Sequence, residues 1–138
     1  MKANRFFLDT TYVLALLNPN DNYHKQARAI LKSMNSAREV WITEAVLIEI
    51  GNSLSHSNRI AASAFIHSCY VTPNVKVVSV DTPLLNRALD FYNNRGDKDW
   101  GLTDCISFIV MTDQDLKEAL TTDEHFQQAG FKALLLMH

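Results

Sequence analysis

Short apolar runs alternate with longer helical stretches along the whole chain. The β-branched and aromatic content of these runs favours strands, and helical spacing of apolar residues marks the stretches between them. Strands that alternate with helices predict an α/β fold with a parallel sheet, because each helix carries the chain back across the sheet in a right-handed crossover. The expected strands are residues 5–8, 39–42, 75–80, 118–122 and 132–137. The expected helices are residues 12–17, 24–36, the segment after Thr43, residues 59–69, 83–92, the segment from 104, and 126–130.

Local patterns add detail to this outline. The near-continuous valines of residues 75–80 predict a strand buried on both faces. Thr43 and Thr82 are each expected to cap a helix, the latter with Pro83 at the first helical position. Thr103 is expected to cap the helix that begins at Asp104, whose carboxylate the helix dipole would favour.

Four carboxylates occupy matching positions in this outline. Asp9 and Asp123 each follow a strand, Asp104 begins a helix, and Glu49 lies about a turn and a half into the helix after the second strand. In parallel sheets the loops at the carboxyl ends of strands meet in a crevice where the strand order reverses. We therefore expect these four side chains to converge, although any one aspartate alone is compatible with a merely structural role.

Converging carboxylates need a counter-ion, because they repel one another at neutral pH. No lysine or arginine stands at an equivalent position, and oxygen ligands suit Mg²⁺ or Mn²⁺ better than zinc. Two such ions about 4 Å apart would stabilise both the attacking and the leaving oxygen of a phosphodiester. The histidines have no partner at helical spacing and are expected to serve surface or packing roles, with His125, close to Asp123, the one to examine; they are His24, His56, His67, His125 and His138.

Composition limits the alternatives. The 138 residues suit one domain, residues 1–138, and the net charge of −2 means that nucleic-acid binding would need a local basic patch or bridging metal ions. Cys69 and Cys105 are expected to be buried, reduced thiols of a cytoplasmic protein. We expect no signal peptide and no membrane association, since no apolar run approaches the ~20 residues that span a bilayer.

Four acidic blocks carry a resemblance to a known family. In family order and spacing, they resemble the PIN-domain family: Phe7-Leu-Asp9-Thr, Glu44-Ala-Val-Leu-Ile-Glu49-Ile-Gly-Asn52, Leu102-Thr-Asp104-Cys-Ile-Ser-Phe108 and Leu120-Thr-Thr-Asp123-Glu-His-Phe126. The resemblance implies a three-layer α/β/α sandwich with a parallel sheet of about five strands. It also implies metal-dependent cleavage of RNA. Many small prokaryotic members are toxins of the VapC type, held inactive by a cognate antitoxin, and a homodimer is a further expectation.

The resemblance assigns roles residue by residue. It makes Asp9, Glu49, Asp104 and Asp123 the catalytic, metal-binding carboxylates, with Glu44 a rival for the second position. A water molecule would attack the phosphorus atom in line, without a covalent protein intermediate. Supporting or RNA-contacting roles are implied for Thr10 beside Asp9, Asn52 beside Glu49, Asp99 near the site, and Arg95 and Lys98 on RNA phosphate. Asp97 and Asp99 are equally compatible with an exposed loop, and Trp100 with either a base contact or the core.

Two alternatives remain open from the sequence. Asp9-Thr-Thr11 after a strand weakly resembles haloacid-dehalogenase phosphatases, although Thr11 stands where that family has a second aspartate. A catalytically degenerate PIN-like domain could instead be a scaffold that binds RNA or protein, although all four carboxylates are present.

Overall fold

A computed structural model describes residues 4–136 and contains one five-stranded sheet. All strand pairs are parallel, and the spatial order is β3-β2-β1-β4-β5. The predicted α/β class and the parallel sheet are confirmed. The strands are β1 Arg5–Leu8, β2 Glu39–Thr43, β3 Val75–Val78, β4 Glu118–Leu120 and β5 Lys132–Ala133.

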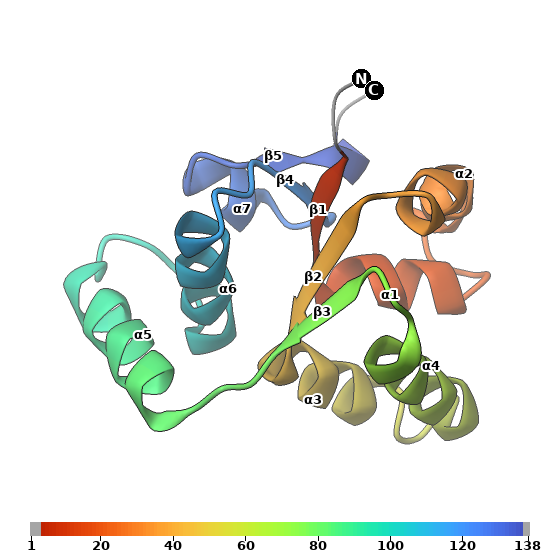
Figure 1. Ribbon diagram of the computed structural model, residues 1–138, viewed down its shortest axis with the longest axis horizontal. Helices are drawn as coiled ribbons and strands as arrows, with labels where there is room; N and C mark the ends of the chain where they lie inside the picture. The colour runs from red at the N-terminus through yellow and green to blue at the C-terminus, as the bar shows by residue number, and fades with distance from the viewer. Residues whose placement is uncertain (1–3, 137–138) are drawn as a thin grey trace.

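Seven α-helices cover the two faces of the sheet and complete a three-layer sandwich (Figure 1). Helices α1 Thr10–Leu17, α2 His24–Asn35, α3 Glu44–Ser53 and α4 Arg59–Val71 lie on one face. Helices α5 Thr82–Asn94, α6 Leu102–Asp113 and α7 Glu124–Gln128 lie on the other, and a 3₁₀ turn, Leu134–Leu136, follows β5.

The strand order reverses between β1 and β4. From β1 the chain moves outward through β2 to β3. It then returns through α5 and α6, which form the connection, and enters β4 on the other side of β1. Phe7 pairs with Ala119 and Leu8 with Leu120, so the two strands end side by side. This switch point is where an open α/β sheet presents a crevice to ligands.

Packing of the sheet against both helical layers holds the carboxyl edge in place. Phe7, Ile42 and Leu120 are fully buried in the sheet, and Phe126 on α7 packs against Phe7 with ring centroids 6.2 Å apart. Burying a side chain of this size contributes about 2–3 kcal/mol relative to leaving it exposed. The residues that follow β1 and β4 therefore start from fixed positions.

Several local predictions are confirmed. The Thr43 hydroxyl accepts the Val46 N–H and caps α3, and α2 buries Ala27 while Lys25 and Arg28 stay exposed. Both cysteines are buried and free. Across residues 4–136, the helices are too short or too polar for any of them to cross a membrane.

The prediction for the valine-rich strand was wrong. β3 pairs only with β2 at the edge of the sheet, Lys76 is exposed, and Val77 and Val78 are only partly buried. Valine favours a pleated backbone at an edge as well as in the centre, so composition alone did not distinguish the two positions.

Two predicted helix caps were also wrong. α6 begins at Leu102 with Gly101 as its N-cap, so Thr103 lies inside the first turn. α5 is capped by the Asp81 carboxylate, which accepts the Leu84 N–H at 3.0 Å. In both cases an acidic side chain that accepts a backbone N–H moves the helix start towards the N-terminus.

Element ends differ by a few residues elsewhere. α1 begins at Thr10 rather than at residue 12, and α7 begins at Glu124 rather than at 126. β4 ends at Leu120, and the expected last strand, residues 132–137, is a two-residue strand followed by the 3₁₀ turn. Met137 and His138 lie outside the described residues.

Candidate active site

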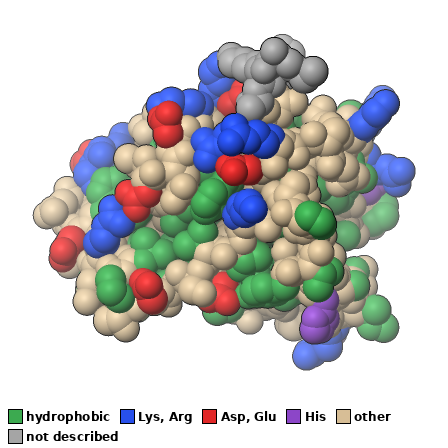
Figure 2. All heavy atoms as spheres, in the orientation of Figure 1, with side chains coloured by type: hydrophobic (Ala, Val, Ile, Leu, Met, Phe, Trp, Pro, Cys, Tyr) green, Lys and Arg blue, Asp and Glu red, His purple; other side chains and the backbone are tan. Residues whose placement is uncertain are grey.

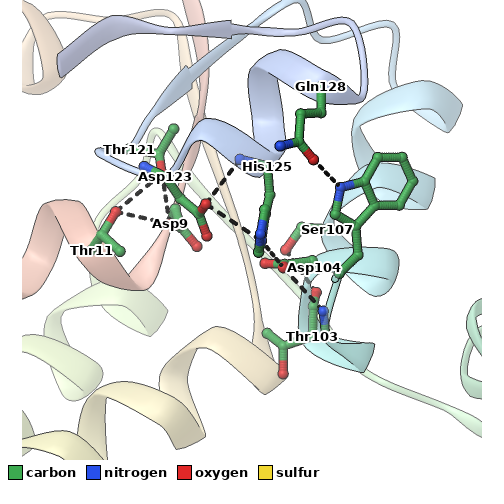
Figure 3. A network of polar contacts seen from close by, with 11 residues as sticks. Asp9, Thr11, Thr103, Asp104, Ser107, Thr121, Asp123, His125 and Gln128 are labelled. Carbon is green, nitrogen blue, oxygen red and sulfur yellow. Dashed lines mark hydrogen bonds and ion pairs between the residues drawn. The ribbon is translucent and has the colours of Figure 1, made fainter. Parts of the chain in front are cut away.

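Asp9 lies in a cradle of two threonine hydroxyl groups at the switch point (Figure 3). Its side chain is directly after β1, and the residue is 5% exposed. Thr11 Oγ1 donates to Asp9 Oδ2 at 2.9 Å, and Thr121 Oγ1, directly after β4, donates to the same oxygen at 2.7 Å. We call Asp9, Thr11 and Thr121 the threonine cradle. It joins the carboxyl ends of the two central strands through side chains.

The cradle holds a carboxyl group that resists ionisation. Burial raises the pKa of Asp9 to about 6, and the nearby charge of Asp104 adds to this, while the hydrogen bonds from Thr121 and Thr11 oppose it. Desolvation disfavours a charged carboxylate unless an opposite charge lies close by. A cation at this edge would remove that penalty.

Three further side chains meet at the ends of α6 and α7. Ligand atoms of Asp104, Asp123 and His125 all lie within 4.8 Å of one another. His125 Nδ1 lies 2.9 Å from Asp104 Oδ2 and 3.4 Å from Asp123 Oδ1. We call these residues the helix-end trio. Unlike Asp9, its members keep part of their side-chain surface in contact with solvent.

Helix capping positions two members of the trio. Asp104 accepts the Gly101 N–H at 3.2 Å at the start of α6, and Asp123 accepts the His125 N–H at 2.9 Å at the start of α7. Burial and the charge of Asp123 raise the pKa of Asp104, against the opposing hydrogen bond with His125. Burial works against the charged imidazole, but its contacts with Asp104 and Asp123 raise the pKa of His125 overall.

Backbone hydrogen bonds connect the cradle to the trio. The Asp123 N–H donates to Thr121 Oγ1 at 2.9 Å, and the Thr122 N–H donates to Thr11 Oγ1 at 2.9 Å. Each threonine hydroxyl therefore donates to Asp9 and also accepts a backbone N–H from the segment that leads into α7. The two groups of side chains form one continuous polar network (Figure 3).

Glu49 reaches the same edge through Thr10. The Thr10 hydroxyl donates to Glu49 Oε1 at 2.8 Å, which ties α3 to the residue after Asp9. Its rival Glu44 instead accepts the Tyr70 hydroxyl at 2.7 Å on the side of α4. This geometry favours Glu49 over Glu44 as the second carboxylate, although Glu49 is not a member of the trio.

The other residues that the sequence suggested as supporting or RNA-contacting make no hydrogen bond to the four carboxylates within residues 4–136, apart from Thr10. Asn52 and Asp99 are exposed, and neither side chain makes a hydrogen bond within residues 4–136. Arg95 forms a two-point ion pair with Asp97, at 2.9 and 3.1 Å. Trp100 is 5% exposed, so its core interpretation is the one that fits. RNA contacts by Arg95 and Lys98 stay predictions.

Comparison with known proteins identifies the fold family. A family model described as the PIN domain matches residues 6–132. The chain belongs to the PIN domain family. This confirms the resemblance seen in the four acidic blocks, and membership of this family supports an enzyme of the nuclease kind. A search of curated proteins found no match.

Solved structures agree with this membership. The chain is 26% identical to VapC20 of Mycobacterium tuberculosis, a toxin that cleaves the sarcin–ricin loop, with a TM-score of 0.82. That match covers 91% of this chain and 95% of VapC20. FitAcB of Neisseria gonorrhoeae matches at 17% identity and a TM-score of 0.63, covering 93% of this chain and 95% of that one, which supports the fold alone.

The side chains of this PIN domain fit a divalent cation. The trio offers two carboxylates and an imidazole within the span of one coordination shell, and Asp9 adds a carboxylate whose charge is uncompensated. Carboxylate oxygens suit Mg²⁺ and Mn²⁺. Asp104, Asp123, Asp9 and, through its contact with Thr10, Glu49 are the residues that would hold the ion or ions.

The sequence missed the role of the two cradle threonines. Local sequence pattern does not point to Thr11 and Thr121 as partners of Asp9, because a hydroxyl near a strand end usually serves a turn or a cap. The available signal was that each strand-end aspartate has a threonine two positions away, Thr11 after Asp9 and Thr121 before Asp123.

Proposed function

We propose that this PIN domain is a metal-dependent endoribonuclease that hydrolyses RNA phosphodiester bonds with Mg²⁺ or Mn²⁺. The observation that carries the proposal is the convergence of Asp9, Asp104 and Asp123 at the switch point, with Glu49 joined to it through Thr10. Among residues 4–136, no lysine or arginine forms an ion pair with these partly desolvated carboxylates, so the cluster is suited to binding cations and then a phosphate.

The chain's own residues divide the work. The threonine cradle fixes Asp9 Oδ2 through two hydroxyl donors, and within residues 4–136 the other carboxylate oxygen accepts no side-chain hydrogen bond and is left for a ligand. The helix-end trio presents its carboxylates towards solvent, where a phosphodiester can approach. Bound divalent cations would neutralise these carboxylates and stabilise the charge that develops on the phosphate.

We further propose that the protein is the toxin of a type II toxin–antitoxin pair, with a cognate antitoxin as partner and a homodimer as its assembly. Size and the similarity to VapC20 support this role. Because VapC20 cleaves the sarcin–ricin loop, that RNA hairpin is the first defined substrate to test. Expression should arrest growth, the Asp104→Asn variant should not, and sedimentation analysis should give the mass of a dimer.

Cleavage of a mixed RNA pool by the purified protein tests the activity. We expect cutting with Mg²⁺ or Mn²⁺, none with EDTA, and a loss of at least about 100-fold in Asp104→Asn. Asp90→Asn, the same change at an exposed position of α5, is the matched control and should cut normally. A folded Asp104→Asn protein that still cuts would contradict the assignment.

Calorimetry separates an inactive scaffold from a selective nuclease if the pool is not cut. Carboxylate-dependent binding of Mn²⁺ that is lost in Asp104→Asn supports a nuclease with a narrow substrate choice. Absence of such binding supports the scaffold alternative.

A further inference from the structure

A concave region lies between α5, α6 and α7, outside the carboxylate site. It has a volume of about 290 Å³ and four aromatic rings in its walls. We call it the aromatic pocket, and its walls are Phe91, Trp100, Phe108 and Phe131, with Arg95 and Gln128 at its rim. Concave sites with apolar walls and a few convergent polar groups are the usual form of a small-ligand site.

The rings hold one another in place. Trp100 meets Phe108 edge to face with centroids 5.0 Å apart, and Phe91 and Phe131 flank them at 5.7 Å from Trp100 and Phe108 respectively. Trp100 and Phe108 are almost fully buried. The walls are therefore rigid before any ligand arrives, which lowers the entropic cost of binding a flat ring.

Arg95 offers a flat surface at the rim. Its guanidinium lies over the Trp100 ring, 4.7 Å from the centroid, and Asp97 fixes its orientation through two hydrogen bonds. Nucleobases stack on such guanidinium planes as well as on aromatic rings. Arg87, also on the rim, is paired in the same way with Asp113. Because both cations are paired, the pocket favours a neutral flat ligand over a phosphate ion.

The unused polar atoms at the rim are donors. Gln128 Oε1 accepts the Trp100 Nε1–H at 3.0 Å, which turns the amide nitrogen of Gln128 away from Trp100. Within residues 4–136, neither that nitrogen nor Arg95 Nη1 makes a hydrogen bond. A ligand edge with acceptors would satisfy both, and guanine, with O6 and N7, presents two adjacent acceptors.

The pocket is adjacent to the carboxylate site. Trp100 directly precedes Gly101, whose N–H is bound by Asp104, and Phe108 is four residues beyond Asp104 on α6, about 6 Å along the helix axis. Gln128 lies three residues beyond His125 on α7, and Figure 3 shows both extending from that helix. A nucleotide next to the cleaved bond can reach the pocket from this position.

We propose that the aromatic pocket binds one unstacked nucleobase of the RNA beside the cleaved phosphodiester, with guanine preferred. That the base belongs to an RNA substrate rests on the proposed ribonuclease function, but binding of the base itself does not require cleavage. Its physical basis is stacking on the Arg95 guanidinium and on the partly exposed rings of Phe91 and Phe131, with hydrogen bonds from Gln128 and Arg95 to the acceptor edge.

Nuclear magnetic resonance of the full chain in EDTA tests binding without catalysis. The chain has two tryptophans, so each indole N–H gives its own signal. Guanosine monophosphate should shift the Trp100 signal saturably, whereas Trp41, whose indole N–H donates to Glu39 at 3.0 Å, is an internal reference that should not move. Adenosine monophosphate should bind more weakly, because adenine presents a donor beside N7, and inorganic phosphate should leave the Trp100 signal in place.

Gln128→Glu is the decisive variant. It keeps the acceptor for Trp100 and removes the donor for the base, so the affinity for guanosine monophosphate should fall at least about tenfold. Gln127→Glu makes the same change of charge at the preceding exposed position and should bind as wild type does. No shift of the Trp100 signal, an equal shift with phosphate, or equal affinity in Gln128→Glu would overturn the proposal.

RNA cleavage then separates this proposal from the proposed function. If the protein cuts RNA, the wild type should favour guanine at one position next to the cut, and Gln128→Glu should lose that preference. Guanosine monophosphate binding without any cutting would retain the pocket and count against the nuclease. Cutting without base preference, together with no nucleotide binding, would retain the nuclease and refute the pocket.

Discussion

The threonine cradle and the helix-end trio supply carboxylates to one site in different ways. In the cradle, Asp9 is 5% exposed, and two hydroxyls fix one of its oxygens. In the trio, the Asp104 and Asp123 side chains are 17% and 27% exposed and serve as caps of their own helices. The sheet thus supplies a fixed, desolvated carboxylate, and the helix ends supply accessible ones. Ionisation of Asp9 in the folded protein therefore costs more free energy than ionisation of Asp104 or Asp123. Replacing Asp9 by a neutral residue should accordingly change the free energy of unfolding more.

The strongest test of this difference is Asp9→Asn against Asp104→Asn. Both should reduce cleavage by at least about 100-fold, because each removes a carboxylate of the site. They should differ in metal-free stability. The folded-state pKa of Asp9, about 6, is above its ordinary value of 3.8, so the folded state binds this proton more tightly than the unfolded state does. Stability therefore falls as pH rises from about 4 to about 6, and the whole penalty is present above that range.

Asp9→Asn should remove that penalty. In EDTA at about pH 8, its free energy of unfolding should exceed that of the wild type by about 2–3 kcal/mol, and the difference should fade towards about pH 4. Asp104→Asn should gain less, because its side chain keeps contact with solvent. Denaturant unfolding at both pH values measures this. Equal stability of Asp9→Asn and wild type at about pH 8 would show that the cradle carries no ionisation penalty.

Thr121→Val tests how much the threonine cradle contributes to stability. Thr121 is fully buried, and its hydroxyl donates to Asp9 and accepts the Asp123 N–H, so its loss removes the partner of that N–H and leaves Asp9 Oδ2 with Thr11 as its hydroxyl donor. The free energy of unfolding should fall by about 1–3 kcal/mol. Thr112→Val is the matched control, since that hydroxyl is on an exposed residue of α6 and bonds only to the Phe108 carbonyl. Its effect should stay within about 0.5 kcal/mol, and a similar loss in both variants would argue against a special role of Thr121.

Asp81→Ala gives the smallest effect and isolates capping from catalysis. Asp81 caps α5 as Asp123 caps α7, but it lies outside the site. Its replacement should lower the free energy of unfolding by about 1 kcal/mol and leave cleavage unchanged. Thr82→Ala, at the position that the sequence pattern favoured as the cap, should change stability much less. A larger loss in Thr82→Ala than in Asp81→Ala would contradict the observed cap.

Sequence patterns located the carboxylates better than they located their surroundings. Asp9 was expected directly after a strand and Asp104 in the first turn of a helix, and each lies there. Asp123 was also expected directly after a strand, but it lies three positions beyond the end of β4, at the N-cap of α7. The caps were misplaced at Thr103 and Thr82, because threonine, glycine and aspartate are all good N-caps and local preference does not choose among neighbours. Trp100 likewise has the same local pattern in a core position as in a base-stacking one. Its burial depends on contacts with Phe91 of α5 and Gln128 of α7, which only the packing of these helices brings together.

Local sequence patterns were enough to predict the alternation of strands and helices, and with it a parallel α/β sheet whose carboxyl edge carries the acidic residues. Which residues meet at that edge depends on how the chain folds as a whole. Thr121 holds Asp9 across 112 positions, and His125 contacts Asp104 across 21, because β4 pairs with β1 and α6 packs beside α7. Strand order depends on how the whole chain buries its apolar surface, whereas propensity and spacing are local. That is why the carboxylates could be predicted from the sequence, and the threonine cradle and the aromatic pocket could not.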